Sequence, residues 1–277
     1  MTFEMGPALL FCPGDRPGRF TGALERADAV IIDLEDAVAP SAKEAARHAL
    51  VASNLDPTRT IVRVNPVDSD EFEHDVLALS ATAYTTVMLS KMSAASQAVA
   101  LAGYQVIALC ETAAGVLAAP LIAAEPNVVA LMWGAEDLVA SLGGTTSRHP
   151  DGRYRDIARH ARSQVQLAAG AHGKAAIDAV HLVIDDLDGL LAEATDAVAS
   201  GFAATACIHP AQVPVIREAY RPTPAAVEHA RAIIAASHGT HGVFVYDGRM
   251  IDSPVLKQAE ALLRREHHAE SGTTPDA

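Results

Sequence analysis

Acidic side chains follow directly on an apolar stretch of this chain, in residues 29–38, AVIIDLEDAV. Ala29 to Ile32 are apolar, and three acids come within the next four positions, Asp33, Glu35 and Asp36. The chain already carries a formal net charge of -13, so carboxylates that converge here repel one another unless cations lie between them. The stretch therefore predicts a polar site in which arginine, lysine or a metal ion balances the acids.

Ionisable residues follow the other apolar stretches as well. They are Asp15, Arg16, Arg63, Lys91, Glu111, Glu136, Asp137, Asp178 and His209. Active sites of barrel enzymes lie at the carboxyl ends of the strands, so these residues predict one shared pocket. No cysteine or histidine cluster has ligand spacing, whereas carboxylate oxygens suit a hard ion such as Mg²⁺. Spacing alone does not decide which of the acids bind it.

Eight short apolar stretches alternate with alanine-rich segments that are typical of helices. The stretches begin at Ala8, Ala29, Thr60, Thr85, Gln105, Val128, Ala176 and Thr205. Most lack strict alternation, as expected for strands that are covered on both faces. Eight βα units predict an α/β fold, a (β/α)₈ TIM barrel. A doubly wound open sheet is the alternative, weakened because no G-x-G-x-x-G follows the first stretch.

The pattern changes after residue 220, which predicts a barrel over 1–220, a C-terminal segment over 221–268 and a tail over 269–277. The segment is expected to contain a helix, a hairpin around Asp247 and Gly248, and a last helix. It looks too short for an independent core, so we expect a lid or oligomerisation segment. The tail, AESGTTPDA, is expected to be disordered.

Composition excludes several classes of protein. The acidic balance argues against general nucleic-acid binding, which needs clustered lysine and arginine. No apolar run reaches the roughly 18 residues that span a bilayer, and no signal peptide is evident. We therefore expect no membrane association and a soluble cytoplasmic protein. Cys12, Cys110 and Cys207 are expected to be small buried hydrophobic residues.

Six motifs, in order along the chain, resemble the citrate lyase β-subunit family. That family belongs with malyl-CoA lyases in the HpcH/HpaI group of metal-dependent aldolases. The motifs are DAVIIDLEDAVAPSAKEAAR, RVN, LCETAAGV, WGAEDL, CIHPAQ and GRMIDSPVLKQAE. RVN alone is a weak signal, whereas the ordered set is specific and covers nearly the whole chain. The likeness is greatest to stand-alone β-subunit-like proteins of actinobacteria.

The resemblance implies a TIM barrel, usually a homotrimer, with one Mg²⁺ in each active site. The chemistry that it implies joins or cleaves a carbon–carbon bond between an acyl-CoA and a 2-oxo acid. By motif match, Glu111 and Asp137 are the implied metal ligands, and Arg63 grips the 2-oxo acid. Asp252, in the MID motif, is implied to reach the active site of a neighbouring subunit, where it is our candidate base.

Other polar and small residues are expected to support this chemistry. Gly134 and Ala135 are expected to bring backbone close to the metal-bound substrate. Lys91 is expected to bind substrate or orient the site, and Asp178 to orient it. His209 is expected to be a hydrogen-bonded residue at a strand end.

The acids of residues 33–36, Asp33, Glu35 and Asp36, are then expected to support the metal rather than to bind it. They would hold metal-bound waters and orient Arg63 or Lys91. If the strand stays extended, Asp33 and Glu35 share one face and Asp36 points away. Asp36 has a further option, which is to pair with Lys43 or Arg47 in the next helix.

Arginines gather in SRHPDGRYRDIARHAR. Arg148, Arg153 and Arg155 are our candidates for binding the phosphates of CoA. The alternative is a solvated helix face or a subunit contact. Many relatives have a lysine before IHP, where this chain has Thr205, so a CoA contact through that lysine is in doubt.

The sequence thus predicts a Mg²⁺-dependent lyase or synthase acting on a 3-hydroxyacyl-CoA that resembles citryl-, malyl- or methylmalyl-CoA. Three alternatives stay open. The chain could be a β-subunit that works only within a larger citrate lyase. It could be a malyl-CoA-type thioesterase, or a non-catalytic binder of CoA metabolites.

Overall fold

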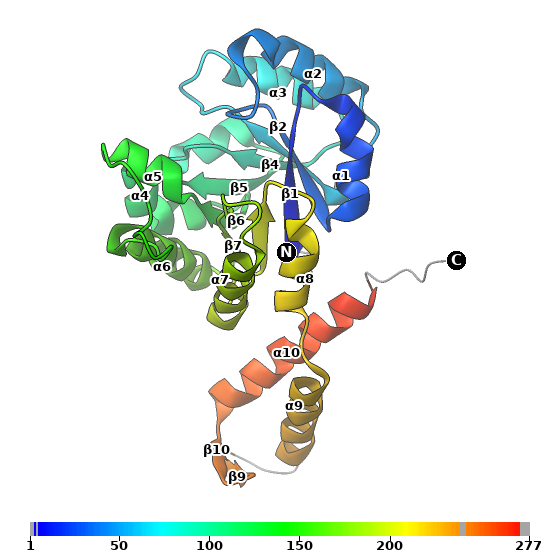
Figure 1. Ribbon diagram of the computed structural model, residues 1–277, viewed down its shortest axis with the longest axis vertical. Helices are drawn as coiled ribbons and strands as arrows, with labels where there is room; N and C mark the ends of the chain where they lie inside the picture. Colours follow the sequence, from blue (N-terminus) through cyan, green and yellow to red (C-terminus); the bar gives the residue numbers. More distant parts are fainter. Residues whose placement is uncertain (1–2, 4, 239–241, 272–277) are drawn as a thin grey trace. The chain divides into compact units, whose positions relative to one another are not determined.

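The computed structural model describes residues 3, 5–238 and 242–271, and its first compact unit is a closed barrel of parallel strands (Figure 1). The strands are β1 (Ala8–Pro13), β2 (Ala29–Asp33), β3 (Thr60–Val64), β4 (Thr86–Leu89), β5 (Gln105–Cys110), β6 (Val128–Trp133), β7 (Ala175–Asp178) and β8 (Ala204–Cys207). Each strand pairs with its neighbour in sequence, and β8 pairs with β1 to close the barrel. The predicted (β/α)₈ barrel is confirmed, and each predicted stretch forms one strand.

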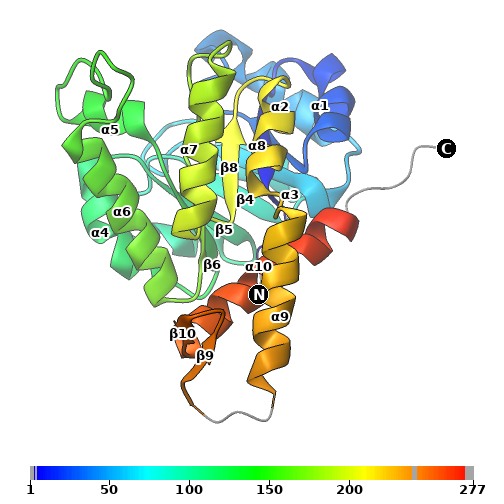
Figure 2. The same ribbon diagram turned by 60° about the horizontal axis from the view of Figure 1, so that its bottom comes forward.

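Helices connect the strands and cover the outside of the barrel (Figure 2). The α-helices of this layer are α1 (Phe20–Arg26), α2 (Lys43–Ala52), α3 (Phe72–Ser80), α4 (Ala113–Ala123), α5 (Ala135–Ser141), α6 (Asp156–Ala171), α7 (Leu187–Ser200) and α8 (Gln212–Tyr220). Shorter 3₁₀ segments are η1 (Pro17–Arg19), η2 (Pro40–Ala42), η3 (Pro57–Arg59) and η4 (Ala95–Leu101). Alanines at helical spacing face the sheet, such as Ala158, Ala161 and Ala168 of α6, which lets the helices pack closely on it.

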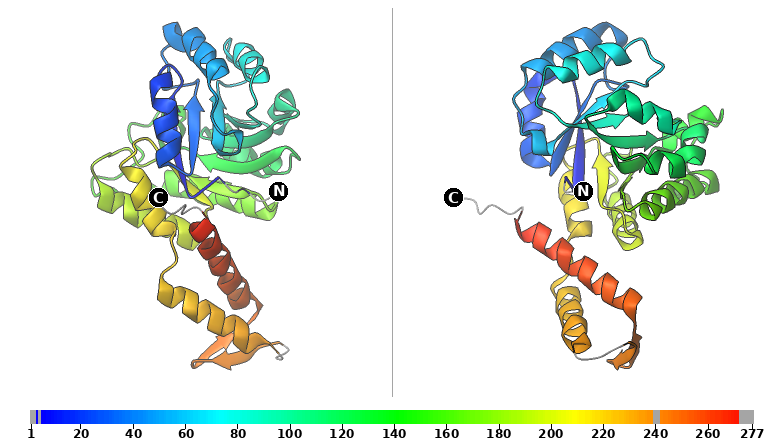
Figure 3. Two further views of the ribbon diagram at one scale, coloured as in Figure 1. Left: turned by 90° about the vertical axis from the view of Figure 1, so that its right-hand side faces the viewer. Right: turned by 180° about the vertical axis from the view of Figure 1, so that it is seen from behind.

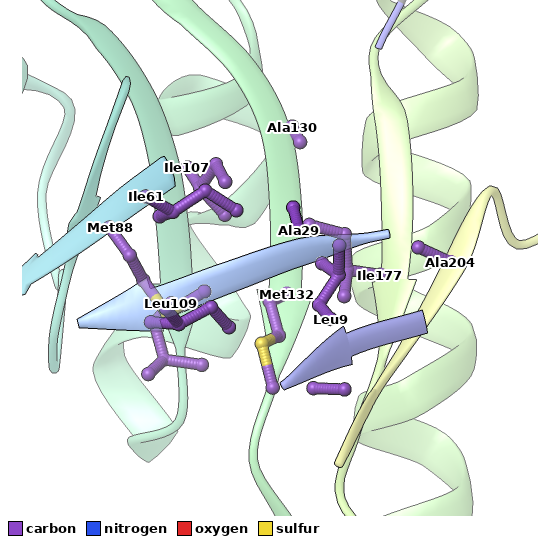
Figure 4. Close-up of a cluster of buried hydrophobic side chains, with 12 residues drawn as sticks. Leu9, Ala29, Ile61, Met88, Ile107, Leu109, Ala130, Met132, Ile177 and Ala204 are labelled. Carbon is purple, nitrogen blue, oxygen red and sulfur yellow. The ribbon is translucent and has the colours of Figure 1, made fainter. Parts of the chain in front are cut away.

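Every second strand side chain fills the barrel interior, because neighbouring side chains of a strand point to opposite faces. The interior cluster consists of Leu9, Ala29, Ile31, Ile61, Met88, Ile107, Leu109, Ala130, Met132, Ile177, Ala204 and Ala206. Figure 4 shows their side chains converging from the surrounding strands. All of them are at most 3% exposed, so this cluster is the packed base on which the layer above it rests.

The next inward positions lie two residues further along the strands, toward their carboxyl ends. Five of these positions are occupied by Phe11, Asp33, Arg63, Glu111 and Gly134. Active sites of TIM barrels are built at this end of the strands. The alternation that fills the core therefore also brings an arginine and two acids together above it, and we call these five residues the strand-end layer.

The second compact unit begins at Arg217, within α8 and so slightly before the predicted boundary at 220. It contains α9 (Pro224–Ser237), β9 (Phe244–Tyr246), β10 (Arg249–Ile251) and α10 (Ser253–Ser271), and Figure 3 shows it from two sides. It has a small core of its own around Ile233 and Ile251, contrary to our expectation. The left-handed φ angles of Asp247 and Gly248, 49° and 71°, suit the tight turn of the predicted hairpin.

The predicted tail over 269–277 is helical in its first three residues, because α10 continues through Ser271. Residues 272–277 lie outside the described residues. Across the part of the chain that the structure describes, no helix has the length and apolar character needed to cross a membrane.

Candidate active site

Arg63 is the central cation of the strand-end layer. Its Nε and Nη2 donate to the two carboxylate oxygens of Asp33 at 2.7 and 2.5 Å. Nη1 lies 3.1 Å from Oε2 of Glu35, and the guanidinium lies 4.9 Å from the centroid of the Phe11 ring. The Asp33 side chain is fully buried, and such a carboxylate needs a bidentate partner of this kind. The charges of Asp33, Glu35 and Glu111 hold the pKa of Arg63 above its usual range despite burial.

The acids that follow β2 are fixed by a tight turn. The backbone N–H groups of Glu35 and Ala37 donate to Asp33 at 2.9 and 3.0 Å, and that of Asp36 donates to Oε2 of Glu35 at 2.9 Å. This turn directs the side chains of Glu35 and Asp36 to the same partner, Lys91. The condition under which Asp36 would point away from Glu35, a strand that stays extended through residue 36, is not met, because β2 ends at Asp33.

Lys43 and Arg47 do not pair with Asp36. The ammonium of Lys43 donates to the backbone oxygens of Leu34 and Glu35 at 2.8 and 3.1 Å, and so stabilises the turn. Arg47 pairs with Glu71 and Asp75 at 2.6 and 3.1 Å. The predicted pairing of Asp36 with the next helix is therefore replaced by its ion pair with Lys91 at 3.0 Å.

Lys91 follows β4 and reaches acids from three parts of the barrel. Its ammonium forms a close ion pair with Glu35 and lies 3.5 Å from Oδ1 of Asp137. Its backbone N–H donates to Oε1 of Glu111 at 3.1 Å. Its φ of 51° is left-handed, which is uncommon for a residue with a side chain. The neighbouring acids hold the pKa of Lys91 above its usual range despite partial burial.

Glu111 and Asp137 form the acidic pair of the site. Burial of Glu111, and then the charge of Asp137, raise the pKa of Glu111 to about 8, while Arg63 and Lys91 pull it down. Glu111 is 3% exposed, whereas the Asp137 side chain is 36% exposed. One buried and one accessible carboxylate that repel each other make a place where a cation is favoured.

This donor set fits Mg²⁺. The ion usually takes one or two protein carboxylates and leaves its other positions to water and substrate. Among the described residues, no group of three or more His, Cys, Asp or Glu side chains is arranged to hold a metal by itself. Glu111 and Asp137 would therefore hold the ion, and a ligand with oxygen atoms would complete its coordination.

The absence of a side chain at Gly134 leaves space for the Glu111 side chain. A Cβ at this position would lie 2.7 Å from Oε2 and 2.9 Å from Cβ of Glu111. Ala135 begins α5 directly after it and is buried. Because a side chain at 134 would displace the Glu111 carboxylate, the predicted importance of this glycine has a steric reason. The predicted backbone contact of Gly134 and Ala135 with substrate stays a prediction.

Asp178 does not face the strand-end layer. Its neighbour Ile177 points into the barrel, so Asp178 points outward, toward α6. It accepts from Nε1 of Trp133 at 2.6 Å and pairs with Arg162 at 2.8 Å. The expectation that Asp178 orients the site is therefore wrong, and this buried group ties β6 and β7 to α6. His209, as expected, is hydrogen-bonded after β8, since its Nδ1 accepts from the N–H of Ala211 at 3.2 Å.

Two of the three predicted CoA-phosphate arginines, Arg148 and Arg153, pair with acids of the barrel unit. Arg148 forms a close ion pair with Glu193 and lies 3.8 Å from the centroid of Tyr154. Arg153 pairs with Asp151 at 2.8 Å, and Arg155 precedes α6 as its cap residue. Their phosphate role stays a prediction. Thr205 is buried within β8.

Asp252 belongs to the second unit. It follows β10, and its Oδ1 accepts from the backbone N–H of Val255 at 3.3 Å, at the start of α10. Its predicted role as a base contributed to a neighbouring subunit stays a prediction.

Two residues of this region were missed by reasoning from sequence. Phe11 contacts Arg63, and its position two residues after the core residue Leu9 could have revealed it. His181, after β7, is buried between Glu193 at 2.9 Å and Asp186 at 3.3 Å. It lies three residues after Asp178, where a polar side chain beyond a strand end is the only signal.

The barrel and its strand-end residues together define a (β/α)₈ protein with a cluster of acids that is balanced by Arg63 and Lys91 and suited to Mg²⁺. A family model, HpcH/HpaI aldolase/citrate lyase, matches residues 8–210. The chain belongs to this family. The expected resemblance is thereby confirmed.

Known relatives cover almost the whole chain. The citrate lyase subunit beta-like protein of Mycobacterium tuberculosis is 54% identical over 96% of this chain and 97% of its own length. A (3S)-malyl-CoA thioesterase of Cereibacter sphaeroides is 34% identical over 90% and 92%. The mitochondrial citramalyl-CoA lyase of Homo sapiens is 31% identical over 91% and 83%. The crystal structure of CitE from M. tuberculosis in complex with magnesium, acetoacetate and coenzyme A has a TM-score of 0.91 at 54% identity, covering 96% of this chain and 99% of that one.

Gly134→Ala is expected to displace the Glu111 carboxylate. We expect Mg²⁺ affinity to fall by about tenfold or more, since misplaced support of a metal ligand costs about 10–100-fold. Overpacking is expected to lower the free energy of unfolding by about 1–3 kcal/mol. Calorimetric titration with MgCl₂ and urea unfolding measure the two effects. Gly170→Ala in α6, where a Cβ meets nothing within 4 Å, is the matched control. It is expected to be neutral or stabilising, and equal behaviour of the two variants would contradict the steric role of Gly134.

Proposed function

We propose that this protein is a Mg²⁺-dependent carbon–carbon lyase or synthase. It interconverts a 3-hydroxyacyl-CoA with a short acyl-CoA and a 2-oxo acid. The observation that carries the proposal is the position of Arg63, which Asp33 holds in the strand-end layer close to Glu111, one of the two acids proposed to bind the metal. The ligands of the mycobacterial structure, magnesium, acetoacetate and CoA, and the activity named for the human relative support this substrate class.

Arg63 is suited to hold the 2-oxo acid. A guanidinium has five N–H groups. Asp33 engages Nε and one N–H of Nη2, and Oε2 of Glu35 lies 3.1 Å from Nη1, which leaves one N–H on each of Nη1 and Nη2. The remaining N–H groups can pair with the carboxylate of the substrate and stabilise negative charge that develops on its neighbouring oxygen. Asp33 and Phe11 fix the guanidinium before substrate arrives, so little reorganisation is needed at the moment of reaction.

The metal is held by Glu111 and Asp137 in this proposal. When bound, Mg²⁺ polarises the carbonyl or hydroxyl oxygen of the 2-oxo acid or 3-hydroxy group and orients that substrate. Glu35 and Asp36 hold Lys91 beside Asp137. The backbone N–H of Lys91 also donates to Oε1 of Glu111 at 3.1 Å, so Lys91 contacts both proposed metal ligands.

Cleavage breaks the bond between C2 and C3 of the 3-hydroxyacyl-CoA. The hydroxyl gives its proton to solvent water and becomes the carbonyl of the 2-oxo acid, while the electron pair of the broken C2–C3 bond passes into the enolate of the acyl-CoA. A proton must then return to the enolate carbon, and we propose Asp252 of a neighbouring subunit as the donor. In the synthetic direction the same carboxylate is the base. A homotrimer and a cytoplasmic location belong to this proposal through the family resemblance and the sequence.

Product analysis tests the proposal. The protein is incubated with a panel of 3-hydroxyacyl-CoAs, with and without Mg²⁺, and the CoA esters and acids are quantified by chromatography and mass spectrometry. We expect equal amounts of a shorter acyl-CoA and a 2-oxo acid, formed only with Mg²⁺. If no member of the panel is cleaved by protein that binds Mg²⁺ normally, the proposal is wrong, and turnover only with added partner subunits would favour the subunit alternative.

A thioesterase is the second candidate, because a relative of 34% identity is named as one. It attacks the thioester with water and leaves the C2–C3 bond intact. The same experiment separates the two, since a thioesterase yields free CoA and the intact 3-hydroxy acid without any new acyl-CoA. Free CoA in a one-to-one ratio with the hydroxy acid would therefore replace our first proposal with this one.

A further inference from the structure

One residue, Lys91, contacts both acids of the proposed metal pair. Its backbone N–H donates to Oε1 of Glu111 at 3.1 Å, and its ammonium lies 3.5 Å from Oδ1 of Asp137. The two contacts come from opposite ends of the residue, so Lys91 bridges Glu111 and Asp137. Within the part of the chain that the structure describes, Lys91 is the one cation that forms an ion pair with Asp137.

The backbone of Lys91 is held in a conformation that lysine seldom adopts. Its φ is 51°, and the one other described residue besides glycine with positive φ is Asp247, in the hairpin turn. At Asp247 the turn explains the angle. At Lys91 the angle accompanies the contacts with the acids, and uncommon backbone conformations of this kind gather at functional sites. A glycine would adopt it more easily, so the presence of lysine points to a use for the side chain.

Three carboxylates surround the single positive charge of the Lys91 ammonium. Glu35, Asp36 and Asp137 all face it, with a close ion pair to Glu35 and distances of 3.0 and 3.5 Å to the other two. Arg63, the other cation of the site, is engaged by Asp33 and Glu35. Lys91 therefore supplies the positive charge at Asp137, in the place where a divalent ion bound by Asp137 would also act.

We infer that the Lys91 ammonium is a built-in counter-cation that competes with Mg²⁺ for Asp137 and so sets the affinity of the site below its possible maximum. In this inference Glu35 and Asp36 are the alternative partners of the Lys91 ammonium. They hold the ammonium when the metal takes Asp137, so that Lys91 stays beside the site rather than leaving it. This inference rests on the proposed function, because it takes Glu111 and Asp137 as the metal pair.

Titration of the substrate-free protein with MgCl₂ in a calorimeter tests the inference. Lys91→Met is expected to bind Mg²⁺ about tenfold more tightly than the natural chain, the scale expected when a unit charge is removed from within a few ångströms of a divalent ion in a partly solvated pocket. Lys91→Gly, which suits the left-handed backbone, is expected to tighten binding equally. Lys91→Arg keeps the charge and is expected to stay within about threefold of the natural chain.

A control variant separates the local effect from general loss of charge. Lys174→Met removes the same charge at the amino end of β7, where the ammonium contacts only the backbone oxygens of Glu125 and Val128, and is expected to leave Mg²⁺ affinity unchanged. A second readout is thermal unfolding. Without Mg²⁺ the Lys91→Met protein is expected to unfold at a lower temperature, and added Mg²⁺ is expected to raise that temperature more than in the natural chain.

Unchanged or weaker Mg²⁺ binding in both folded variants, Lys91→Met and Lys91→Gly, would overturn the inference. The same holds if Lys174→Met tightens binding as much as they do. The results that would refute the proposed function differ from those that would refute this inference. A natural chain that binds Mg²⁺ but cleaves no 3-hydroxyacyl-CoA refutes the lyase proposal while leaving the affinity comparison valid, and a natural chain that binds no Mg²⁺ refutes the metal pair and this inference together.

Discussion

Glu111→Gln is expected to abolish Mg²⁺ binding and carbon–carbon cleavage while keeping the fold. The amide has the same shape but lacks the charge that a hard cation requires. We expect Mg²⁺ affinity to fall by more than about 100-fold, beyond the 10–100-fold that loss of a supporting partner costs. Stability is expected to hold or rise, because Glu111 is buried beside Asp137 and its charged form is disfavoured there, whereas a neutral amide costs less to bury. Calorimetric titration, turnover and urea unfolding measure the three quantities.

Glu35→Gln and Asp36→Asn are the matched comparisons for this prediction. Both change one acid of the same pocket to its amide, but their side chains contact Lys91 and, for Glu35, Arg63. We expect their effects on Mg²⁺ affinity to stay within about 10–100-fold, and so to be smaller than that of Glu111→Gln. The reverse order would place the metal at the turn after β2 and would contradict the assignment of Glu111.

Much of the site follows from the sequence by counting along the strands. Once Ile31, Ile61 and Leu109 are taken as core residues, a step of two leads to acids or arginine in each strand, Asp33, Arg63 and Glu111. The same count places Asp178 outward, because Ile177 is the inward residue of β7. Our expectation for Asp178 treated every polar residue at a strand end alike, and alternation of side chains within the strand decides against it.

Contacts that depend on turns were not predictable in this way. The extended model of residues 33–36 fails because the side chain of Asp33 accepts the N–H groups of Glu35 and Ala37 and so ends β2. The left-handed backbone of Lys91 could not be predicted, because a lysine, unlike a glycine, does not indicate this conformation. The partner of Arg148 is Glu193 of α7, 45 positions away, and such a pairing is set by how helices pack around the barrel.

Arg63→Met is expected to cause the largest loss of stability among single substitutions at this site, together with a large loss of activity. It leaves Asp33 fully buried without its bidentate partner. Removal of one member of a buried ion pair costs about 3–5 kcal/mol of the free energy of unfolding. Cleavage is expected to fall by about 10²–10³-fold or more, the scale for loss of one donor to a developing oxyanion. Arg63→Lys keeps the charge but not the planar pair of N–H donors, so we expect a smaller loss of stability and a large loss of turnover.

A double-substitution cycle with Asp33→Asn separates the two roles of Arg63. The chain that carries both Arg63→Met and Asp33→Asn no longer buries an unpaired charge, so its free energy of unfolding is expected to recover by at least about 1 kcal/mol relative to Arg63→Met alone. Turnover is expected to stay as low as in Arg63→Met, because the group that holds the 2-oxo acid is still missing. Urea unfolding and steady-state cleavage, measured on all four proteins, give both comparisons. Recovery of turnover together with stability would mean that Arg63 acts only through the fold, and the substrate clamp would then have to be sought elsewhere in the strand-end layer.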